Sequence, residues 1–185
     1  MRVVAGIAGG IPLQIPKHDL RPTMDKVKGA IFSSLGEMVV GARVLDLFSG
    51  SGALGIEALS RGAASAVLLD NNVQAIQSIN DNLSKTRLQA VVQRDDVFRF
   101  LKQNTAEFDL ILADPPYTKT TSVTDFAAQL FACADLVKAL APNGIFVLER
   151  APTELLHENT IFEILKQKRY GASEVLFFTR RKTEL

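Results

Sequence analysis

The sequence predicts an α/β fold in which a mostly parallel, seven-stranded sheet carries helices on both faces. Between residues 43 and 149, short apolar runs alternate with helical patterns, which is typical of parallel strands joined by right-handed crossovers. Two strand-like runs near the end of the chain have no helix between them, so they predict an antiparallel hairpin at one sheet edge. A glycine-rich turn follows the first of these strands, at the position where nucleotide-binding α/β folds have their glycine-rich turn.

The first twenty residues are expected to form a small N-terminal hairpin extension (1–20), set apart from the main domain (21–185). Residues 2–5 are mostly β-branched or apolar, and the glycines of residues 6–10 supply a turn before residues 11–13.

The main domain opens with a helix that ends near Leu35. Thr23 is a plausible N-cap, and Val27, Ile31 and Leu35 belong to its apolar stripe. The alternating strands that follow are expected at Val44–Leu47, Ala66–Asp70, Ala90–Gln93, Phe108–Ala113 and Ile145–Glu149. The intervening helices are expected at Ala53–Ser60, Val73–Leu83, Val97–Lys102 and Asp125–Leu140, and the terminal hairpin strands at Thr160–Gln167 and Glu174–Thr179.

Composition is that of one soluble globular domain: of 185 residues, 47% are hydrophobic and 22% are charged. No apolar run approaches the roughly 20 residues of a membrane span. A single cysteine, Cys133, excludes an internal disulfide, and we expect it to pack within the long helix. With His18 and His157 far apart as well, we expect no metal site. These features favour a reducing compartment, the cytoplasm, and we expect a monomer.

The net charge is only +1, yet basic residues gather near both ends of the chain. Residues 1–30 hold five basic and two acidic side chains, and residues 166–182 hold six basic and one acidic. If the two segments meet on one face, they form a basic surface suited to phosphates. Two unrelated solvated faces are an equally good interpretation.

The glycine-rich turn between the first strand and its helix is a candidate cofactor loop. Gly50 and Gly52 permit a tight turn and let a ligand lie against bare backbone. Asp70 follows at the end of the second strand, where a carboxylate can accept hydrogen bonds from both hydroxyls of a ribose. The candidate cofactor-binding residues here are Asp46, Phe48, Gly50, Ser51, Gly52, Leu54, Asp70 and Asn71.

Two cofactors compete for this loop. Gly50, Gly52 and Gly55, with an acid twenty residues after the first, match the dinucleotide fingerprint of NAD-binding proteins. Asp46 favours S-adenosylmethionine instead, because a carboxylate there suits a cationic amino-acid end and would repel a pyrophosphate. Two further residues follow the third strand: Asp96 could accept from an adenine 6-amino group, and the Val97 N–H could reach a ring nitrogen. Capping of the next helix explains Asp96 equally well.

The most informative stretch is Asp114-Pro115-Pro116-Tyr117, directly after the apolar strand that ends at Ala113. Two consecutive prolines remove two backbone donors and fix two φ angles, and the first pushes Asp114 toward an extended conformation. The resulting stiff corner offers hydrogen-bond acceptors and a flat ring, which suits a planar molecule bearing an NH2 group. The predicted catalytic residues are Asp114 and the Pro115 carbonyl, which accept the amine hydrogens, and Tyr117, which stacks on the base.

With these motifs in view, the chain resembles the RsmD family of 16S rRNA guanine-N2 methyltransferases. The likeness runs through residues 2–6, the Arg21-Pro22-Thr23 segment with Asp25 and Val27, residues 44–61, residues 113–117 and Tyr170-Gly171. Two features depart from the family pattern. Residues 6–12 lack the basic side chains frequent in the family's hairpin, and Asp70 stands where a glutamate is common.

The resemblance implies a Rossmann-like class I methyltransferase fold with strand order 3-2-1-4-5-7-6. It also implies S-adenosylmethionine as methyl donor and S-adenosylhomocysteine as product, whereas the expectation of no metal and no membrane comes from composition. The implied partner is 16S rRNA or a small-ribosomal-subunit assembly intermediate, with the N-terminal hairpin contacting RNA. Arg21 and Thr23 would bind the cofactor's carboxylate end or the RNA backbone, with a helix lead-in as the alternative.

Other functions remain open at this point. The same amine chemistry could act on DNA adenine N6 or a protein glutamine, although 185 residues leave no room for a separate DNA-recognition domain. An NAD-dependent oxidoreductase and a catalytically silent RNA-binding assembly factor are the remaining alternatives.

Overall fold

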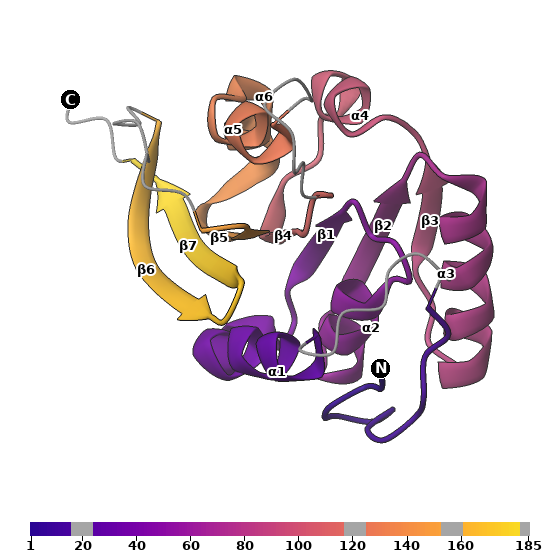
Figure 1. The fold of residues 1–185 in the computed structure, drawn as a ribbon. Coiled ribbons are helices and arrows are strands. Elements are labelled where there is room, and N and C mark those ends of the chain that lie inside the picture. The colour runs from indigo at the N-terminus through magenta and orange to yellow at the C-terminus, as the bar shows by residue number, and fades with distance from the viewer. Residues whose placement is uncertain (16–23, 117–124, 153–160, 182–185) are drawn as a thin grey trace.

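A seven-stranded sheet runs through the middle of the computed structural model, which describes residues 1–15, 24–116, 125–152 and 161–181 (Figure 1). The strand order is β3-β2-β1-β4-β5-β7-β6, as the family resemblance implies. The first five strands pair in parallel, and β7 is antiparallel to both β5 and β6. The strands are β1 Arg43–Leu47, β2 Ser65–Asp70, β3 Val91–Arg94, β4 Phe108–Ala113, β5 Leu140–Arg150, β6 Phe162–Tyr170 and β7 Ser173–Arg180.

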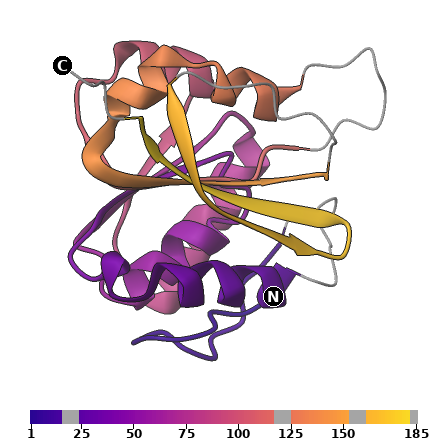
Figure 2. The ribbon, with the colours of Figure 1, turned by 90° about the vertical axis from the view of Figure 1, so that its left-hand side faces the viewer.

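Helices cover both faces of this sheet (Figure 2). Buried residues of α1, α2 and α3 belong to one hydrophobic core, and those of α4, α5 and α6 belong to the other. The helices are α1 Met24–Leu35, α2 Ala53–Ser60, α3 Val73–Thr86, α4 Val97–Gln103, α5 Phe126–Phe131 and α6 Ala134–Ala139, with a 3₁₀ turn, η1 Gly36–Val39, after α1.

The central strands supply side chains to both cores in alternation. In β4, Leu110 and Leu112 belong to the core under α1–α3, whereas Ile111 and Ala113 belong to the core under α4–α6. This two-residue period is the geometry of a pleated strand, and burial on both faces explains why β4 reads as a continuous apolar run. The residue that follows Ala113 therefore points toward the α1–α3 side.

The expected long helix over residues 125–140 is wrong: α5 and α6 are separate helices. Both Leu130 and Leu136 are fully buried in one core. On a continuous helix, six residues at roughly 100° each would place them about 120° apart, so the break lets both face the sheet. Cys133 consequently lies at the N-cap of α6, half-buried, rather than inside a helix.

β5 also begins earlier than expected, at Leu140 instead of Ile145. Leu140 pairs with Phe108 and Ile145 with Leu110, so the intervening residues of β5, which include Pro142-Asn143-Gly144, form a bulge. β4 and β5 are in continuous register after this bulge, up to Ala113 and Leu148.

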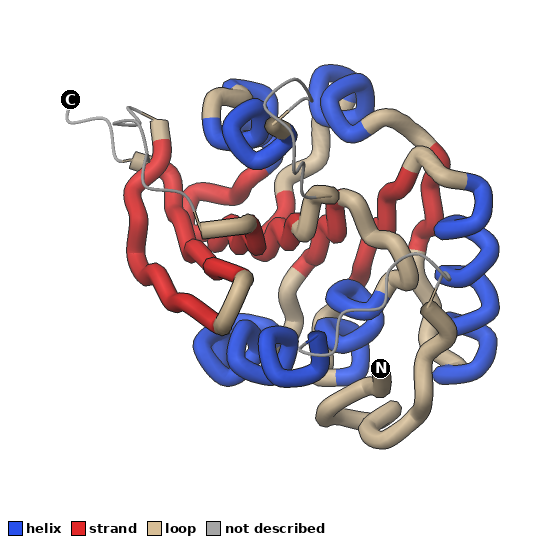
Figure 3. Tube along the Cα trace, viewed as in Figure 1, coloured by secondary structure: helices blue, strands red, loops and turns tan. Residues whose placement is uncertain are grey.

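The N-terminal segment packs on the main fold instead of standing apart (Figure 3). Its hairpin is reduced to one bridge, between Arg2 and Pro12. Val3 and Ala8 are buried in the α1–α3 core, and the Ile7 N–H donates to the Ser60 carbonyl of α2 (2.8 Å).

A buried carboxylate, Glu57 of α2, fastens this segment. Glu57 is fully buried and accepts hydrogen bonds from the backbone N–H groups of Val4 (2.7 Å) and Ala5 (3.0 Å). It also accepts from Nε of Arg61 (2.7 Å) and pairs with Nζ of Lys28 at 3.2 Å. Lys28, itself 3% exposed, donates to the Arg2 carbonyl (2.5 Å). The network joins the N-terminal segment to α1 and α2 through satisfied charges.

Candidate active site

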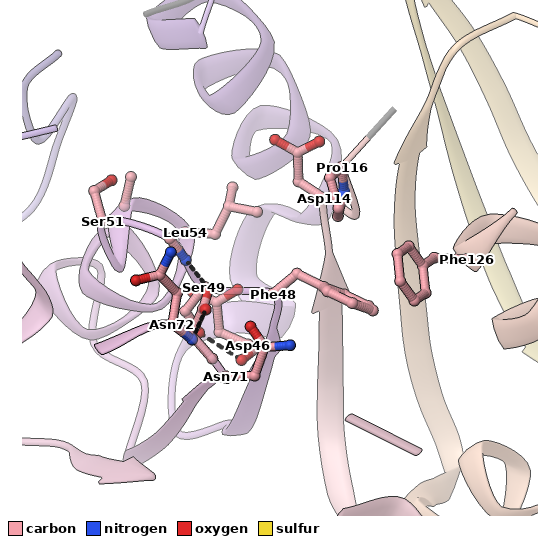
Figure 4. A pocket seen from close by; sticks show the side chains of 13 residues that line it. Asp46, Phe48, Ser49, Ser51, Leu54, Asn71, Asn72, Asp114, Pro116 and Phe126 are labelled. Carbon is pink, nitrogen blue, oxygen red and sulfur yellow. Dashed lines mark hydrogen bonds between the residues drawn. The ribbon is translucent and has the colours of Figure 1, made fainter. Parts of the chain in front are cut away.

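A cavity of about 310 Å³ lies where β1, β2 and β4 end, within the size range of small-molecule sites. This is the crevice outside the carboxyl ends of the strands, where open α/β sheets bind ligands. Figure 4 shows the glycine-rich loop on one side and Asp114, Pro116 and Phe126 on the other. The lining residues are Asp46, Phe48, Ser49, Gly50, Ser51, Ala53, Leu54, Asp70, Asn71, Asn72, Asp114, Pro116 and Phe126.

The loop between β1 and α2 has a conformation that glycine permits. Gly50 and Gly52 have φ angles of 54° and 77°, and a Cβ on Gly52 would come within 2.8 Å of a Leu68 methyl group. Phe48 also has a positive φ, 56°, which is uncommon for a bulky residue and is found mainly where function constrains the backbone. Gly52 is buried and does not line the cavity; it packs against the core, where only a glycine leaves room for Leu68.

Asp46 combines burial with a place at the cavity. It is 1% exposed, and its Oδ2 accepts a hydrogen bond from the Gly55 N–H (2.9 Å). Burial, reinforced by the nearby carboxylate of Asp70, raises the pKa of Asp46 to about 7, against the stabilising effect of the Gly55 N–H. A cation placed beside Asp46 would favour its charged form.

Asp70 holds the loop in place from β2. Its Oδ2 accepts from the Gly50 N–H and its Oδ1 from the Asn72 N–H, both at 2.9 Å. The Ser49 hydroxyl adds a second tie, because it accepts from the Leu69 N–H (2.9 Å) and donates to the Asp46 carbonyl (2.6 Å). A carboxylate has about four acceptor positions, so Asp70 can also accept from a ligand.

On the other side of the cavity, Asp114 and Pro116 follow β4, and a cluster of aromatic rings lies beside them. The Phe126 ring lies 5.3 Å from that of Phe48 and is stacked at 6.4 Å on that of Phe98. Phe126 is missing from the sequence-based candidates, although its place directly after Asp125, the N-cap of α5, was a usable signal. Pro115 is buried and does not line the cavity, which leaves its predicted carbonyl contact a prediction.

Asp96 and Val97 do not line the cavity. Asp96 is the N-cap of α4, where its Oδ1 accepts from the Phe98 and Arg99 N–H groups at 3.0 Å, so the capping alternative is confirmed. Their adenine contact stays a prediction. Three further candidates, Arg21, Thr23 and Tyr117, lie outside the described residues.

Neither a metal cluster nor a membrane span is found in the part of the chain that the structure describes. No three His, Cys, Asp or Glu side chains there could hold a metal ion together. No helix within the same residues is long and apolar enough to cross a membrane.

The sheet order, its antiparallel end and the cavity beside the glycine-rich loop define a Rossmann-like fold of the class I methyltransferase type. The chain matches the family described as "Conserved hypothetical protein 95" over residues 1–179. It belongs to this family, the RsmD family, which confirms the resemblance inferred from the sequence.

Relatives in this group carry methyltransferase names. The chain is 36% identical to YlbH of Bacillus subtilis, named as a candidate rRNA methyltransferase, over 98% of this chain and 100% of that protein. It is 31% identical to ribosomal RNA small subunit methyltransferase D of Haemophilus influenzae, over 92% and 89% of the two chains.

Solved structures agree with the fold. A candidate methyltransferase of Escherichia coli, YhhF, superposes with a TM-score of 0.83 at 27% identity, covering 99% of both chains. The Thermus thermophilus 16S rRNA N2 G1207 methyltransferase RsmC, in complex with AdoMet and guanosine, superposes with a TM-score of 0.71 at 29% identity. That match covers 89% of this chain and 44% of RsmC.

Proposed function

We propose that this protein transfers the methyl group of S-adenosylmethionine to the exocyclic N2 amine of a guanosine in 16S rRNA. One observation carries the proposal: Asp114, from the Asp-Pro-Pro corner, lines the same cavity as the glycine-rich loop and the two carboxylates Asp46 and Asp70. An amine acceptor and a nucleoside-binding loop thus face one space, as methyl transfer to an amine requires.

The polar groups that line the cavity suit S-adenosylmethionine. Asp46 would hold the cationic amino group, Asp70 would accept from the ribose hydroxyls, and the bare backbone at Gly50 would allow close approach. Asp46 argues against NAD, because its carboxylate would repel the pyrophosphate at the glycine-rich loop. When bound, the cofactor supplies a methyl group on a positively charged sulfur.

The acceptor side follows from the chemistry of the guanine amine. The lone pair of this amine is delocalised into the ring. Groups that accept hydrogen bonds from the two amine hydrogens must therefore orient the nitrogen so that its lone pair faces the methyl carbon. Asp114 serves this purpose, and we expect Pro115 and Tyr117 to assist it. In the transfer, the nitrogen–carbon bond forms as the carbon–sulfur bond breaks and neutral S-adenosylhomocysteine leaves. The methylated amine then loses its proton, which Asp114 or water accepts.

RNA as the acceptor is supported by the names of the relatives and by charge placement. Methyltransferase D of Haemophilus influenzae is named for small-subunit rRNA, and RsmC for N2 of a 16S rRNA guanosine. Lys166 of the second basic segment lies against α1, because its Nζ donates to the Ser34 hydroxyl of that helix (3.1 Å). The Arg2 N–H reaches Asp25 of the same helix (3.2 Å). These contacts bring β6 and the N-terminal residues to the same helix, and the exposed basic side chains around it would suit phosphates; Lys28, buried and paired with Glu57, is not among them.

Mapping methylated nucleotides in rRNA from cells with and without this protein tests the proposal. We expect one N2-methylguanosine of 16S rRNA to disappear without the protein and to return with the wild-type gene but not with an Asp114→Ala gene. Unchanged rRNA would direct the search to DNA adenine, a protein glutamine or a non-catalytic role in assembly. Stabilisation of the protein by NAD and not by S-adenosylhomocysteine would overturn the cofactor assignment.

A further inference from the structure

A second, smaller recess of about 30 Å³ adjoins the main cavity. It shares Ala53, Leu54 and Asp114 with that cavity, so the two spaces meet at the residue that would hold the acceptor amine. Its remaining lining residues are Met1, Lys28 and Glu149. A small recess on the acceptor side of Asp114 is where the edge of an incoming base would be read.

The sheet register places Glu149 beside Asp114. Ala113 of β4 pairs with Leu148 of β5 in parallel, and both side chains belong to the core under α4–α6. The residue that follows β4, Asp114, and the next residue of β5, Glu149, are therefore expected at the same level and on the opposite face. Two carboxylates from adjacent strands thus converge on the recess.

The facing wall of the recess is fixed by the buried network around Glu57. Lys28 is committed to the Arg2 carbonyl at 2.5 Å and to Glu57 at 3.2 Å, and it also lies 3.8 Å from Asp25. Its ammonium therefore holds the chain at Arg2 in position, and Lys28 lines the same recess as Asp114 and Glu149. Glu149, half-buried, also interacts within the protein, and a carboxylate has acceptor positions for more than one donor.

Guanine offers adjacent donors on its Watson–Crick edge, N1–H and the 2-amino group. Adenine has an acceptor at N1 beside its 6-amino group, and cytosine has an acceptor at N3 beside its 4-amino group. We infer that Glu149 accepts the N1–H of guanine while Asp114 holds the 2-amino group, which makes Glu149 the residue that selects guanine. The inference deepens the proposed function and rests on it. A base with a lone pair at that position would face the Glu149 carboxylate and be rejected.

The test compares guanine with 2-aminopurine at the methylated position of a 16S rRNA fragment. 2-Aminopurine keeps the 2-amino group but has an acceptor in place of N1–H. Wild-type protein should methylate guanine far faster, because buried polar groups discriminate strongly against an analogue that lacks their partner. In Glu149→Gln, the amide can donate a hydrogen bond to N1 of 2-aminopurine. The kcat/KM for guanine divided by the kcat/KM for 2-aminopurine should therefore fall by about tenfold or more relative to the wild type. A structural defect would lower both rates and leave the ratio unchanged.

Two controls accompany the comparison. Glu163→Gln changes an exposed carboxylate on β6 and should leave the ratio as in the wild type. Affinity for S-adenosylhomocysteine should stay the same in Glu149→Gln, because Glu149 does not line the main cavity. An unchanged ratio in Glu149→Gln, with active wild-type protein, overturns the role of Glu149 alone. A wild-type protein that methylates no guanosine in 16S rRNA overturns the proposed function as well.

Discussion

Replacing Glu57 by alanine should destabilise the protein strongly, although Glu57 does not line the cavity. The substitution removes the acceptor of two backbone N–H groups, at Val4 and Ala5, and the partner of two cations, Lys28 and Arg61. Lys28 is 3% exposed, so its ammonium would lose its closest carboxylate within a buried environment. Asp25, 3.8 Å away and partly exposed, compensates only in part.

The magnitude follows from the burial of the pair. Removing one partner of a buried ion pair costs about 3–5 kcal/mol, since the other charge remains desolvated. That is a large part of the roughly 5–15 kcal/mol that stabilises a typical domain. For a chain of this size, each kcal/mol lowers the midpoint of thermal unfolding by about 2–4 °C, so we expect a fall of about 6–20 °C.

Urea unfolding followed by circular dichroism measures this change, with Glu37→Ala as the matched control. Glu37 is exposed in η1, and its substitution should change the free energy of unfolding by less than about 0.5 kcal/mol. A loss below about 1 kcal/mol in Glu57→Ala would contradict the view that the buried network fastens the N-terminal segment.

Three further outcomes are expected. Asp114→Ala should abolish methyl transfer but keep affinity for S-adenosylhomocysteine by calorimetry; undiminished turnover refutes its role. The pKa of Asp46 rises from 3.8 to about 7 on folding, so the folded state holds an extra proton and the free energy of unfolding should fall as pH rises through that window. Asp46→Asn should weaken this dependence in urea unfolding between about pH 4 and pH 8; an unaltered slope speaks against the shift. Gly52→Ala, with its Cβ 2.8 Å from Leu68 and a φ of 77°, should lower the unfolding midpoint and cofactor affinity together, and wild-type values for both would contradict the packing argument.

The alternation of parallel strands and helices was predictable because β1 to β4 are separated by clear helical patterns and turn residues, whereas the strand order came from the family resemblance. Prediction from local pattern was wrong for the helix over residues 125–140 and for the start of β5, because packing between distant residues decides both. Residues 125–140 contain apolar residues at spacings compatible with one helix, but the burial of both Leu130 and Leu136 requires two. The bulge in β5 depends on its register with Phe108, a contact that local sequence does not encode.

In the site, motif residues were predictable and supporting residues were not. Asp46, Gly50, Asp70 and Asp114 stand at strand ends, where the fold class places ligand contacts, and they line one cavity. Phe126 lines the cavity from the start of α5, where its ring contacts those of Phe48 and Phe98, and such ring contacts between separate elements are not encoded locally. Glu149 and Asp114 line one recess because of the register of β4 and β5. The burial of Glu57 depends on the packing of the N-terminal segment.

The most direct measurement of the central claim uses purified protein, methyl-labelled S-adenosylmethionine and small-subunit rRNA from cells that lack this protein. After digestion to nucleosides, the label should appear as N2-methylguanosine, and Asp114→Ala protein should leave the RNA unlabelled. Label in N6-methyladenosine, or no label in RNA or in assembling small subunits, would contradict the account.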